Sequence, residues 1–410
     1  MTAAFRCRAC GSADVRLVLS LGQTPLANAL VQEASLTSPE PKYPLDLAFC
    51  TACTLVQITA SVPPETLFRD YPYFSSFSDT LLAHAKVLTD RITRDRHLDA
   101  TSLAVEVASN DGYLLQYYKE RGVPVLGIEP ARNIAAVAVR ERGIPTVTEF
   151  FDAALAQKLA ADGKSADVLH ANNVLAHVPD LPGFVAGIRT VLKPTGIAVI
   201  EAPYVRDLVD RIEFDTIYHE HLCYFSLTAL RRLFHGHDLE IIDVERLTIH
   251  GGSLRLTAAP RVGSLRSERV DQLLREEEAV GMTKLSYYAD FASRVASLRD
   301  ELCGMLGKLK SEGKRIAAYG AAAKGSTLLN FFGIGRETLD FVVDRSPHKQ
   351  GRYMPGVRLP IVPTTKLVEE VPDYTLLLAW NFADEILEQQ QAYRAKGGRF
   401  IIPVPHVRIV

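Results

Sequence analysis

The pattern of apolar and polar residues predicts an α/β unit in the middle of the chain. Short apolar runs predict strands at 102–108, 125–129, 166–177 and 196–203, the third of which continues into a loop. Segments with helical periodicity lie between these runs. This alternation predicts a doubly wound parallel sheet, in which ligands bind at the carboxyl ends of the strands.

Further elements are expected on both sides of this unit. A helix with one apolar face is predicted over 78–97. After the unit, the pattern predicts a helix at 227–237 and a pair of strands at 239–249 and 252–260. The segment 266–312 is rich in Leu, Glu, Arg and Ala and nearly free of Pro, so we expect one or two long linking helices there.

The residues from 313 to 410 repeat the alternation and predict a second Rossmann-like α/β unit. Its strands are expected at 315–320, 339–344, 374–380 and 399–405, with a helix at 321–333. The fold class is therefore α/β. The expected divisions are a small amino-terminal module at 1–75, the central doubly wound domain at 76–265, the linking helices at 266–312 and the second α/β domain at 313–410.

Composition and charge narrow the classes of partner. Hydrophobic residues make up 47% and charged residues 23% of the chain, which is typical of a globular protein. No stretch approaches the roughly 20 apolar residues of a membrane span, and the amino terminus lacks the apolar core of a signal peptide, so we expect a cytoplasmic protein. The net charge of −2 argues against nucleic acid as a partner and favours a small-molecule substrate. No obligate protein partner is evident.

Four of the six cysteines form two CxxC pairs near the amino terminus: Cys7 with Cys10, and Cys50 with Cys53. Paired CxxC turns bring sulfur atoms together as a tetrahedral zinc site requires, and in a reducing compartment zinc is favoured over disulfides. Four thiolates leave no open coordination position, so the metal is expected to be structural. A nucleic-acid-binding zinc ribbon is the alternative, although residues 35–44 lack its basic and aromatic face.

The first turn of the central unit differs from a dinucleotide-binding turn. It has the single glycine Gly112 in place of GxGxxG. Glu129 lies 18 residues beyond Asp111, at the end of the next strand, where a carboxylate can bind both ribose hydroxyls. Glu106 and Asp111 disfavour a pyrophosphate but suit the cationic S-adenosylmethionine. The turn therefore favours S-adenosylmethionine over a nicotinamide dinucleotide.

The segment 213–226, which reads EFDTIYHEHLCYFS, gathers candidate proton-transfer groups within ten residues: Asp215, Tyr218, His219, Glu220, His221 and Tyr224. Histidine titrates near neutral pH, so a base, an orienting carboxylate and a phenol donor could meet here. Because His219 and His221 are two residues apart, only one of them faces inward on extended backbone. A hydrogen-bonded corner before the helix near Ser226 is an equally open interpretation.

Two other segments carry candidate ligand contacts. The turn at 320–327 offers backbone N–H groups, Lys324 and Ser326 at the amino terminus of a helix, which favours a diphosphate; an ordinary strand-to-helix turn fits it equally well. The aromatic run at 71–74 could line a pocket through Tyr73, although such residues more often belong to a core.

Four segments of the chain together resemble the sugar C-methyltransferases of antibiotic deoxysugar pathways. They are VEVASNDGYLL, HANNVLAHV, EFDTIYHEHLCYFS, and AYGAAAKGSTLLN with DRSPHKQGRYMPG. The resemblance covers almost the whole chain and includes the four-cysteine module. It implies that S-adenosylmethionine donates a methyl group to C-3 of a thymidine diphosphate (TDP)-linked 4-keto-6-deoxysugar, and that the central domain is the methyltransferase domain.

The same resemblance implies roles for individual residues. The implied active-site residues are His177, Tyr218, Glu220 and His221. Those implied at the methyl donor are Glu106, Ala108, Asn110, Asp111, Gly112, Glu129 and Asn173. Those implied at the substrate are Tyr73, Lys324, Ser326 and Lys349.

A 4-keto group acidifies the hydrogens on both neighbouring carbons, because the resulting carbanion spreads onto the oxygen as an enolate. We expect His221 to abstract the proton, Glu220 to orient the imidazole, and Tyr218 or His177 to donate to the enolate oxygen. Methylation at C-5 is the alternative within this chemistry. Two other hypotheses are a nicotinamide-dependent oxidoreductase and a non-catalytic zinc-bearing scaffold that binds sugar nucleotides.

Overall fold

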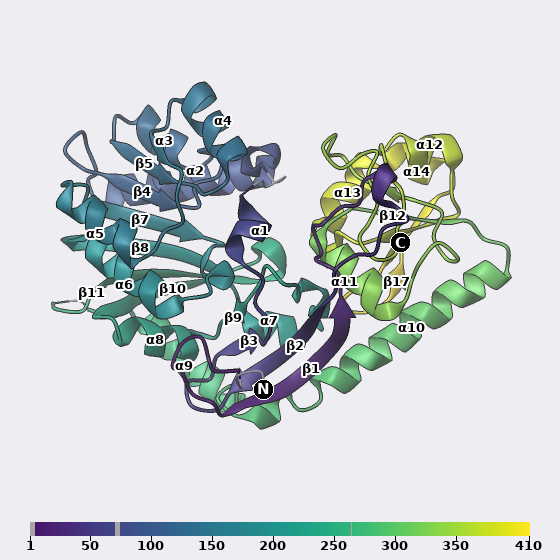
Figure 1. Cartoon of the computed structure of the whole chain (residues 1–410), viewed down its shortest axis with the longest axis horizontal. Coiled ribbons are helices and arrows are strands. Elements are labelled where there is room, and N and C mark those ends of the chain that lie inside the picture. Colours follow the sequence, from purple (N-terminus) through teal and green to yellow (C-terminus); the bar gives the residue numbers. More distant parts are fainter. Residues whose placement is uncertain (1–4, 70–73, 264) are drawn as a thin grey trace.

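The computed structural model describes residues 5–69, 74–263 and 265–410. These residues form three β-sheets with flanking helices. Figure 1 shows the central sheet on one side of the molecule and the carboxyl-terminal sheet on the other, with strands β1 and β2 between them at the base. None of the helices described has a stretch long and apolar enough to cross a membrane.

The smallest sheet belongs mainly to the amino-terminal module. Its antiparallel order is β1-β2-β3-β9. The bounds are β1 Val15–Thr24, β2 Tyr43–Cys50, β3 Val56–Ile58 and β9 Cys223–Tyr224. Strand β9 comes from the segment 213–226, so this segment is hydrogen-bonded directly to the cysteine module. The short helix α1 (Pro64–Phe68) follows the module.

The central sheet has seven strands in the order β10-β11-β8-β7-β4-β5-β6. Five are parallel and form the predicted doubly wound unit: β4 (Ala104–Val107), β5 (Val125–Ile128), β6 (Thr146–Val147), β7 (Ala166–Asn172) and β8 (Leu192–Pro203). The predicted strand pair follows as β10 (Leu239–Leu247) and β11 (Ser253–Pro260), which adds to β8 antiparallel. The parallel strands are almost wholly buried, as sheets covered on both faces require.

Helices accompany the central sheet: α2 (Asp79–Asp95), α3 (Leu115–Glu120), α4 (Arg132–Arg142), α5 (Ala153–Ala161), α6 (Leu181–Val191), α7 (Val205–Asp210) and α8 (Leu227–His235). Several begin at a side chain that accepts a hydrogen bond from a backbone N–H of the first turn. Ser78 caps α2, Asp152 caps α5 and Ser226 caps α8. The corner before Ser226 predicted from the sequence is therefore present.

The linking segment contains α9 (Glu268–Ala279) and α10 (Phe291–Ser311), which confirms the expectation of long helices. Figure 1 shows α10 running below β1 towards the carboxyl-terminal unit. That unit has a sheet of order β14-β13-β12-β15-β16-β17, parallel except for β17. Its strands are β12 (Ile316–Tyr319), β13 (Val342–Val343), β14 (Ile361–Val362), β15 (Tyr374–Leu377), β16 (Arg399–Ile402) and β17 (Arg408–Ile409). Its helices are α11 (Ala323–Phe332), α12 (Lys366–Glu370), α13 (Ala383–Gln389) and α14 (Gln391–Ala395).

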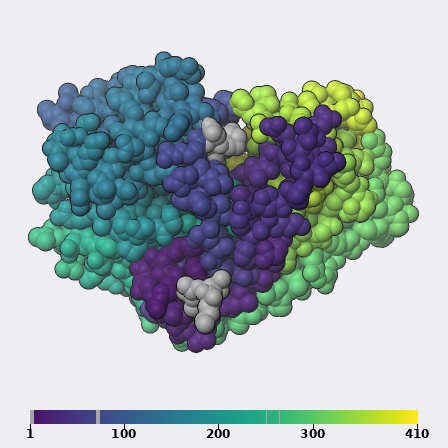
Figure 2. Space-filling view, in the orientation of Figure 1, coloured from purple at the N-terminus to yellow at the C-terminus, as the bar shows by residue number. Residues whose placement is uncertain are grey.

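The amino-terminal, central and carboxyl-terminal units pack against one another and share one hydrophobic core. One hydrophobic cluster extends through all of them, from Phe49 through Ile200 to Val342. The loop after β1 also reaches the carboxyl-terminal unit, where Glu40 accepts from Arg358 at 2.7 Å. Figure 2 shows the amino-terminal residues filling the space between the other two units on this face. Residues distant in sequence can therefore contribute to one site.

Candidate active site

A cavity of about 590 Å³ lies where the three units meet. It opens at the carboxyl ends of β4, β5 and β7, where doubly wound sheets bind ligands. Its lining includes predicted site residues from the central unit and the carboxyl-terminal unit: Ala108, Asn110, Glu129, Asn173, His177, Tyr218, His221, Lys324 and Lys349. The fold therefore gathers nine of the predicted catalytic, donor and substrate residues around one space.

Glu129 lies at the end of the cavity that adjoins β5. Its two carboxylate oxygens accept from the backbone N–H groups of Asn110 (2.9 Å) and Ala131 (2.8 Å), which hold it at the end of β5. Burial raises the pKa of Glu129 to about 7. Ala108 and Asn110 have φ angles of 52° and 50°, in the left-handed region that non-glycine residues rarely adopt. Such backbone is characteristic of turns shaped around a ligand.

Three other residues predicted at the donor, Glu106, Asp111 and Gly112, do not line the cavity described. Glu106 is buried in β4, and its burial, with the charges of Asp111 and Glu129, holds its pKa well above the usual range. Asp111 faces Arg142 at 3.4 Å. Gly112 has φ +80°, and a Cβ there would lie 2.9 Å from Ile144 Cγ1, so the turn requires glycine.

His221 is held by two hydrogen bonds at the cavity wall. Its Nδ1–H donates to the Thr216 carbonyl at 3.0 Å, and its Nε2 lies 2.8 Å from the Tyr218 hydroxyl. Because a carbonyl can only accept, Nδ1 carries a proton, and Nε2 of the neutral ring accepts from Tyr218. The imidazole therefore directs a basic nitrogen towards the cavity side where Tyr218 lies.

Glu220 does not orient His221, contrary to the expectation from the sequence. Its carboxylate is buried and accepts from the Asn28 side-chain amide at 3.1 Å, while the Thr216 carbonyl occupies Nδ1 of His221. The Glu220 carbonyl instead accepts from His177 Nδ1–H at 2.6 Å. The His177 ring lies 4.9 Å from the His221 ring between centroids, and burial lowers the His177 pKa. Glu220 thus supports the site through its backbone and through Asn28.

The carboxyl-terminal residues divide into two groups. Lys324 and Lys349 line the cavity, and the Lys349 ammonium donates to the Ala321 carbonyl at 2.9 Å. Ser326 does not line it: its buried hydroxyl donates to the Ala27 carbonyl at 2.8 Å and so joins α11 to the amino-terminal module. The expectation that Ser326 contacts substrate is therefore not supported by its position. Tyr73 lies outside the described residues.

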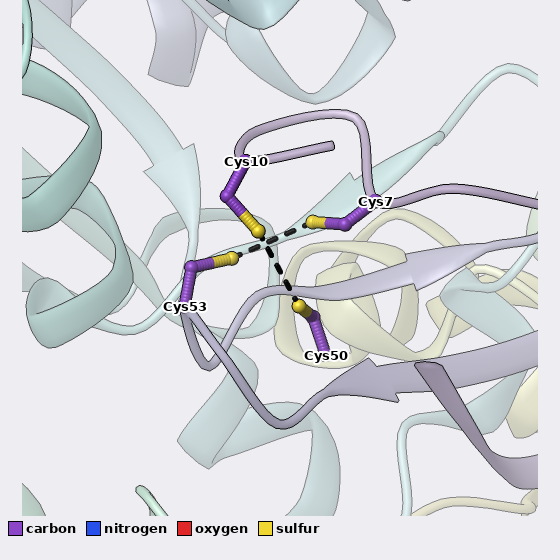
Figure 3. Close-up of side chains that lie close together, drawn as sticks. All are labelled: Cys7, Cys10, Cys50 and Cys53. Atoms are coloured by element: carbon purple, nitrogen blue, oxygen red, sulfur yellow. Dashed lines mark hydrogen bonds between the residues drawn. The ribbon is translucent and has the colours of Figure 1, made fainter. Parts of the chain in front are cut away.

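The four predicted metal ligands form a compact cluster (Figure 3), and none of them lines this cavity. Their sulfur atoms all lie within 4.8 Å of one another, with Cys7 and Cys53 at 3.5 Å and Cys10 and Cys50 at 3.6 Å. A tetrahedral site with Zn–S bonds of about 2.3 Å requires S–S separations of about 3.8 Å. These separations exclude disulfides, whose S–S bond is about 2.05 Å long. The cluster fits a structural zinc ion.

Three family models match successive parts of the chain. They are described as "Putative zinc binding domain" (residues 7–68), "Methyltransferase domain" (86–244) and "C-methyltransferase C-terminal domain" (248–405). The chain is also 36% identical over 405 residues to C-methyltransferase NovU of Streptomyces niveus, a match that covers 98% of this chain and 96% of the relative.

The chain belongs to the C-methyltransferase family. Membership of this family argues against two of the alternative hypotheses, a nicotinamide-dependent oxidoreductase and a non-catalytic scaffold. The solved structures similar to this C-methyltransferase include the PH0226 protein of Pyrococcus horikoshii OT3, with TM-score 0.38 and 15% identity over 49% of this chain and all of that one. Magnesium protoporphyrin IX methyltransferase of Synechocystis PCC 6803 has TM-score 0.34 and 14% identity over 45% of this chain and 79% of that one.

Several residues that line the cavity of this C-methyltransferase were missed by sequence reasoning: Asn28, Phe150, Asp152, Thr216 and Asn381. Phe150 and Asp152 follow β6, so their place after a parallel strand was a usable signal. Asn28 and Asn381 come from the two other units. No local pattern marks them, because they reach the cavity only through the packing of these units.

Proposed function

We propose that this enzyme transfers a methyl group from S-adenosylmethionine to C-3 of a TDP-linked 4-keto-6-deoxysugar through an enolate. The observation that carries the proposal is the placement of an oriented imidazole, His221, in the same cavity as the Glu129 end of β5. A base and a nucleoside site that share one cavity fit proton abstraction followed by methyl transfer.

The donor end fits the nucleoside of S-adenosylmethionine. Glu129 is fixed by two backbone N–H groups, which leaves its remaining lone pairs for the ribose hydroxyls. Ala108 and Asn173, both with positive φ, border the same space. When bound, S-adenosylmethionine supplies an electrophilic methyl group on a sulfonium. Of the acidic residues of this turn, Glu129 lines the cavity, and its ionised form favours that positive charge.

His221 removes a proton from the carbon beside the ketone. The C–H bond breaks, the proton passes to Nε2 of His221, and the electron pair spreads onto the ketone oxygen. The Thr216 carbonyl holds the ring in the tautomer that leaves Nε2 basic, and the Tyr218 hydroxyl yields its place on Nε2 as substrate enters. The carbanion carbon then takes the methyl group, and the electron pair of the broken S–C bond stays on sulfur.

The start of α11 supports the assignment of a nucleotide diphosphate. Ala322 and Ala323 line the cavity at the amino terminus of this ten-residue helix, where backbone N–H groups favour an anion. Lys349 is 21% exposed, lies 3.7 Å from the single carboxylate of Asp344, and stands beside this turn through its hydrogen bond to Ala321. Its ammonium can rotate from that carbonyl to a phosphate oxygen.

The experiment that tests the proposal is incubation of the enzyme with methyl-labelled S-adenosylmethionine and a panel of TDP-4-keto-6-deoxysugars, with the new methyl group located by NMR. A methyl group on C-3 is expected. A methyl group on C-5 would keep the enolate chemistry and change the presentation of the sugar, because both carbons flank the ketone. Methylation of oxygen or nitrogen would overturn the proposal, and so would no transfer to any member of the panel.

A further inference from the structure

Lys324 is the second residue of α11 and lines the cavity wall. Its ammonium nitrogen is buried and has no hydrogen-bond partner among the described residues, and it lies 4.3 Å from the centre of the Trp380 ring. A buried ammonium without a hydrogen-bond acceptor is costly, and burial accordingly lowers the pKa of Lys324. Such a group next to a cavity points to a ligand atom that completes it.

Two carboxyl groups compensate the charge of Lys324. The Asp215 carboxylate accepts from Trp380 Nε1–H at 2.7 Å, and Glu213 lines the cavity nearby. Both act on Lys324 electrostatically and oppose the effect of burial on its pKa. Burial raises the pKa of Asp215 to about 6 and that of Glu213 to about 8. Asp215 and Glu213 are therefore the two acids whose charge offsets that of the Lys324 ammonium.

This charge balance argues against Lys324 as the diphosphate ligand. A diphosphate carries at least two negative charges and binds where positive charge is in excess. Here Lys324 already interacts with two acidic side chains, Asp215 and Glu213, so positive charge is not in local excess. A neutral oxygen that acquires a single negative charge during the reaction suits the cluster better, because the ammonium is preorganised towards it.

Lys324 and His221 lie on two segments, α11 and 213–226, that are hydrogen-bonded to each other. Asp215 directly precedes Thr216, whose carbonyl orients His221. In addition, the Thr327 hydroxyl of α11 donates to the Ile217 carbonyl at 3.1 Å, which fixes the helix to the same segment. His221 and Lys324 therefore line the same cavity and are held by adjoining segments of the chain. This relation is what proton abstraction beside a ketone requires, since the charge appears on the oxygen of the neighbouring carbon.

We propose that Lys324 is the catalytic donor that stabilises the ketone oxygen of the substrate as it becomes an enolate. The inference rests on the proposed function and replaces the sequence-based expectation of Tyr218 or His177 in this role. In this structure the Tyr218 hydroxyl lies on Nε2 of His221, where the abstracted proton goes, and His177 Nδ1–H donates to the Glu220 carbonyl, whereas the Lys324 ammonium has no hydrogen-bond acceptor among the described residues. As the proton passes to His221, the electron pair moves to the oxygen beside Lys324; it returns to carbon when the C–CH₃ bond forms.

The experiment compares Lys324→Met with Lys349→Met, because both lysines line the cavity and each change removes one charge at nearly constant size. Three quantities are measured: the affinity for TDP alone by calorimetry, the rate of solvent-deuterium exchange into the keto-sugar with S-adenosylhomocysteine bound, and kcat. Lys324→Met is expected to keep the TDP affinity and to lower exchange and kcat by about 10²–10³-fold. Lys349→Met is expected to weaken TDP binding by about tenfold.

The inference is overturned if Lys324→Met weakens TDP binding while exchange and kcat at saturating sugar are retained, or if it changes none of the three quantities. If Lys324→Met alone fails to fold, Lys324→Met with Glu213→Gln removes the cation together with one of its buried acids and is held to the same outcomes. Failure of the proposed function is distinguishable, because wild-type enzyme would then show neither exchange nor methyl transfer with any keto-sugar.

Discussion

The replacement His221→Gln tests the assignment of the base most directly. His221 is half-buried, and its two ring nitrogens contact the Thr216 carbonyl and the Tyr218 hydroxyl. A glutamine side chain can still donate its amide N–H to Thr216, but it has no nitrogen that accepts a proton at neutral pH. The change therefore removes the base and preserves much of the local hydrogen bonding.

The His221→Gln replacement is expected to change the free energy of unfolding much less than the barrier to proton transfer. The Tyr218 hydroxyl loses the ring nitrogen to which it donates, which lowers the free energy of unfolding by about 1 kcal/mol. Loss of a positioned general base lowers the rate of proton transfer by about 10²–10⁴-fold, which corresponds to about 3–5 kcal/mol in the barrier. A folded variant with intact ligand binding and almost no exchange is therefore expected.

The assay is solvent-deuterium exchange into the keto-sugar, read by NMR or mass spectrometry, with binding of S-adenosylhomocysteine measured in parallel. His219→Gln is the matched control, since His219 lies two residues away, contacts the Pro44 carbonyl at 3.3 Å and does not line the cavity described. His219→Gln should exchange at the wild-type rate. Wild-type exchange in the His221→Gln variant would refute the reasoning and move the base to another residue.

Three further predictions follow from the same contacts. Because burial raises the pKa of Glu129 to about 7, S-adenosylhomocysteine affinity by calorimetry should fall as the pH decreases through this value, and should no longer do so in Glu129→Gln; the same slope in both proteins would contradict this role. Cys53→Ser should lose the single zinc ion and lower the melting temperature, whereas Cys223→Ser, buried but outside the cluster, should retain zinc by metal analysis. Glu213 has a folded-state pKa of about 8, above its unfolded value, so its contribution to stability is complete at low pH and is lost as the pH rises towards 8. Glu213→Gln should therefore raise the melting temperature at alkaline pH and not near pH 5; an equal effect at both would count against the assignment.

Much of the architecture was predictable because it depends on local periodicity. Apart from the two-residue strand β6, the strands of the central unit were recognised from apolar runs, and the helix at 78–97 appears as α2 from Asp79 to Asp95. The four cysteines were also predictable, since each CxxC turn brings two sulfur atoms together within one loop. Parallel strands all end at one edge, which is why residues after β4, β5 and β7 share the cavity.

The hydrogen-bond partners of the site residues could not be predicted from the sequence. The sequence places Glu220 beside His221, yet adjacent residues on such a corner point in different directions, and the carboxylate meets Asn28, which lies 192 positions earlier. Ser326 likewise follows a helix start that suits an anion, but its hydroxyl is used to hold the amino-terminal module. These outcomes depend on which unit packs against the segment and not on the segment itself.

The sequence by itself determined the main strands and helices of the two α/β units, the four cysteine ligands and the identity of the groups available for proton transfer. Only the tertiary structure decided which of those groups meet: His221 with Thr216 and Tyr218, and Lys324 with Asp215, Glu213 and the Trp380 ring. The physical reason is that periodicity records which face of each element is buried. The partner of a buried polar atom is set by the packing of three units whose contacting residues are far apart in the chain.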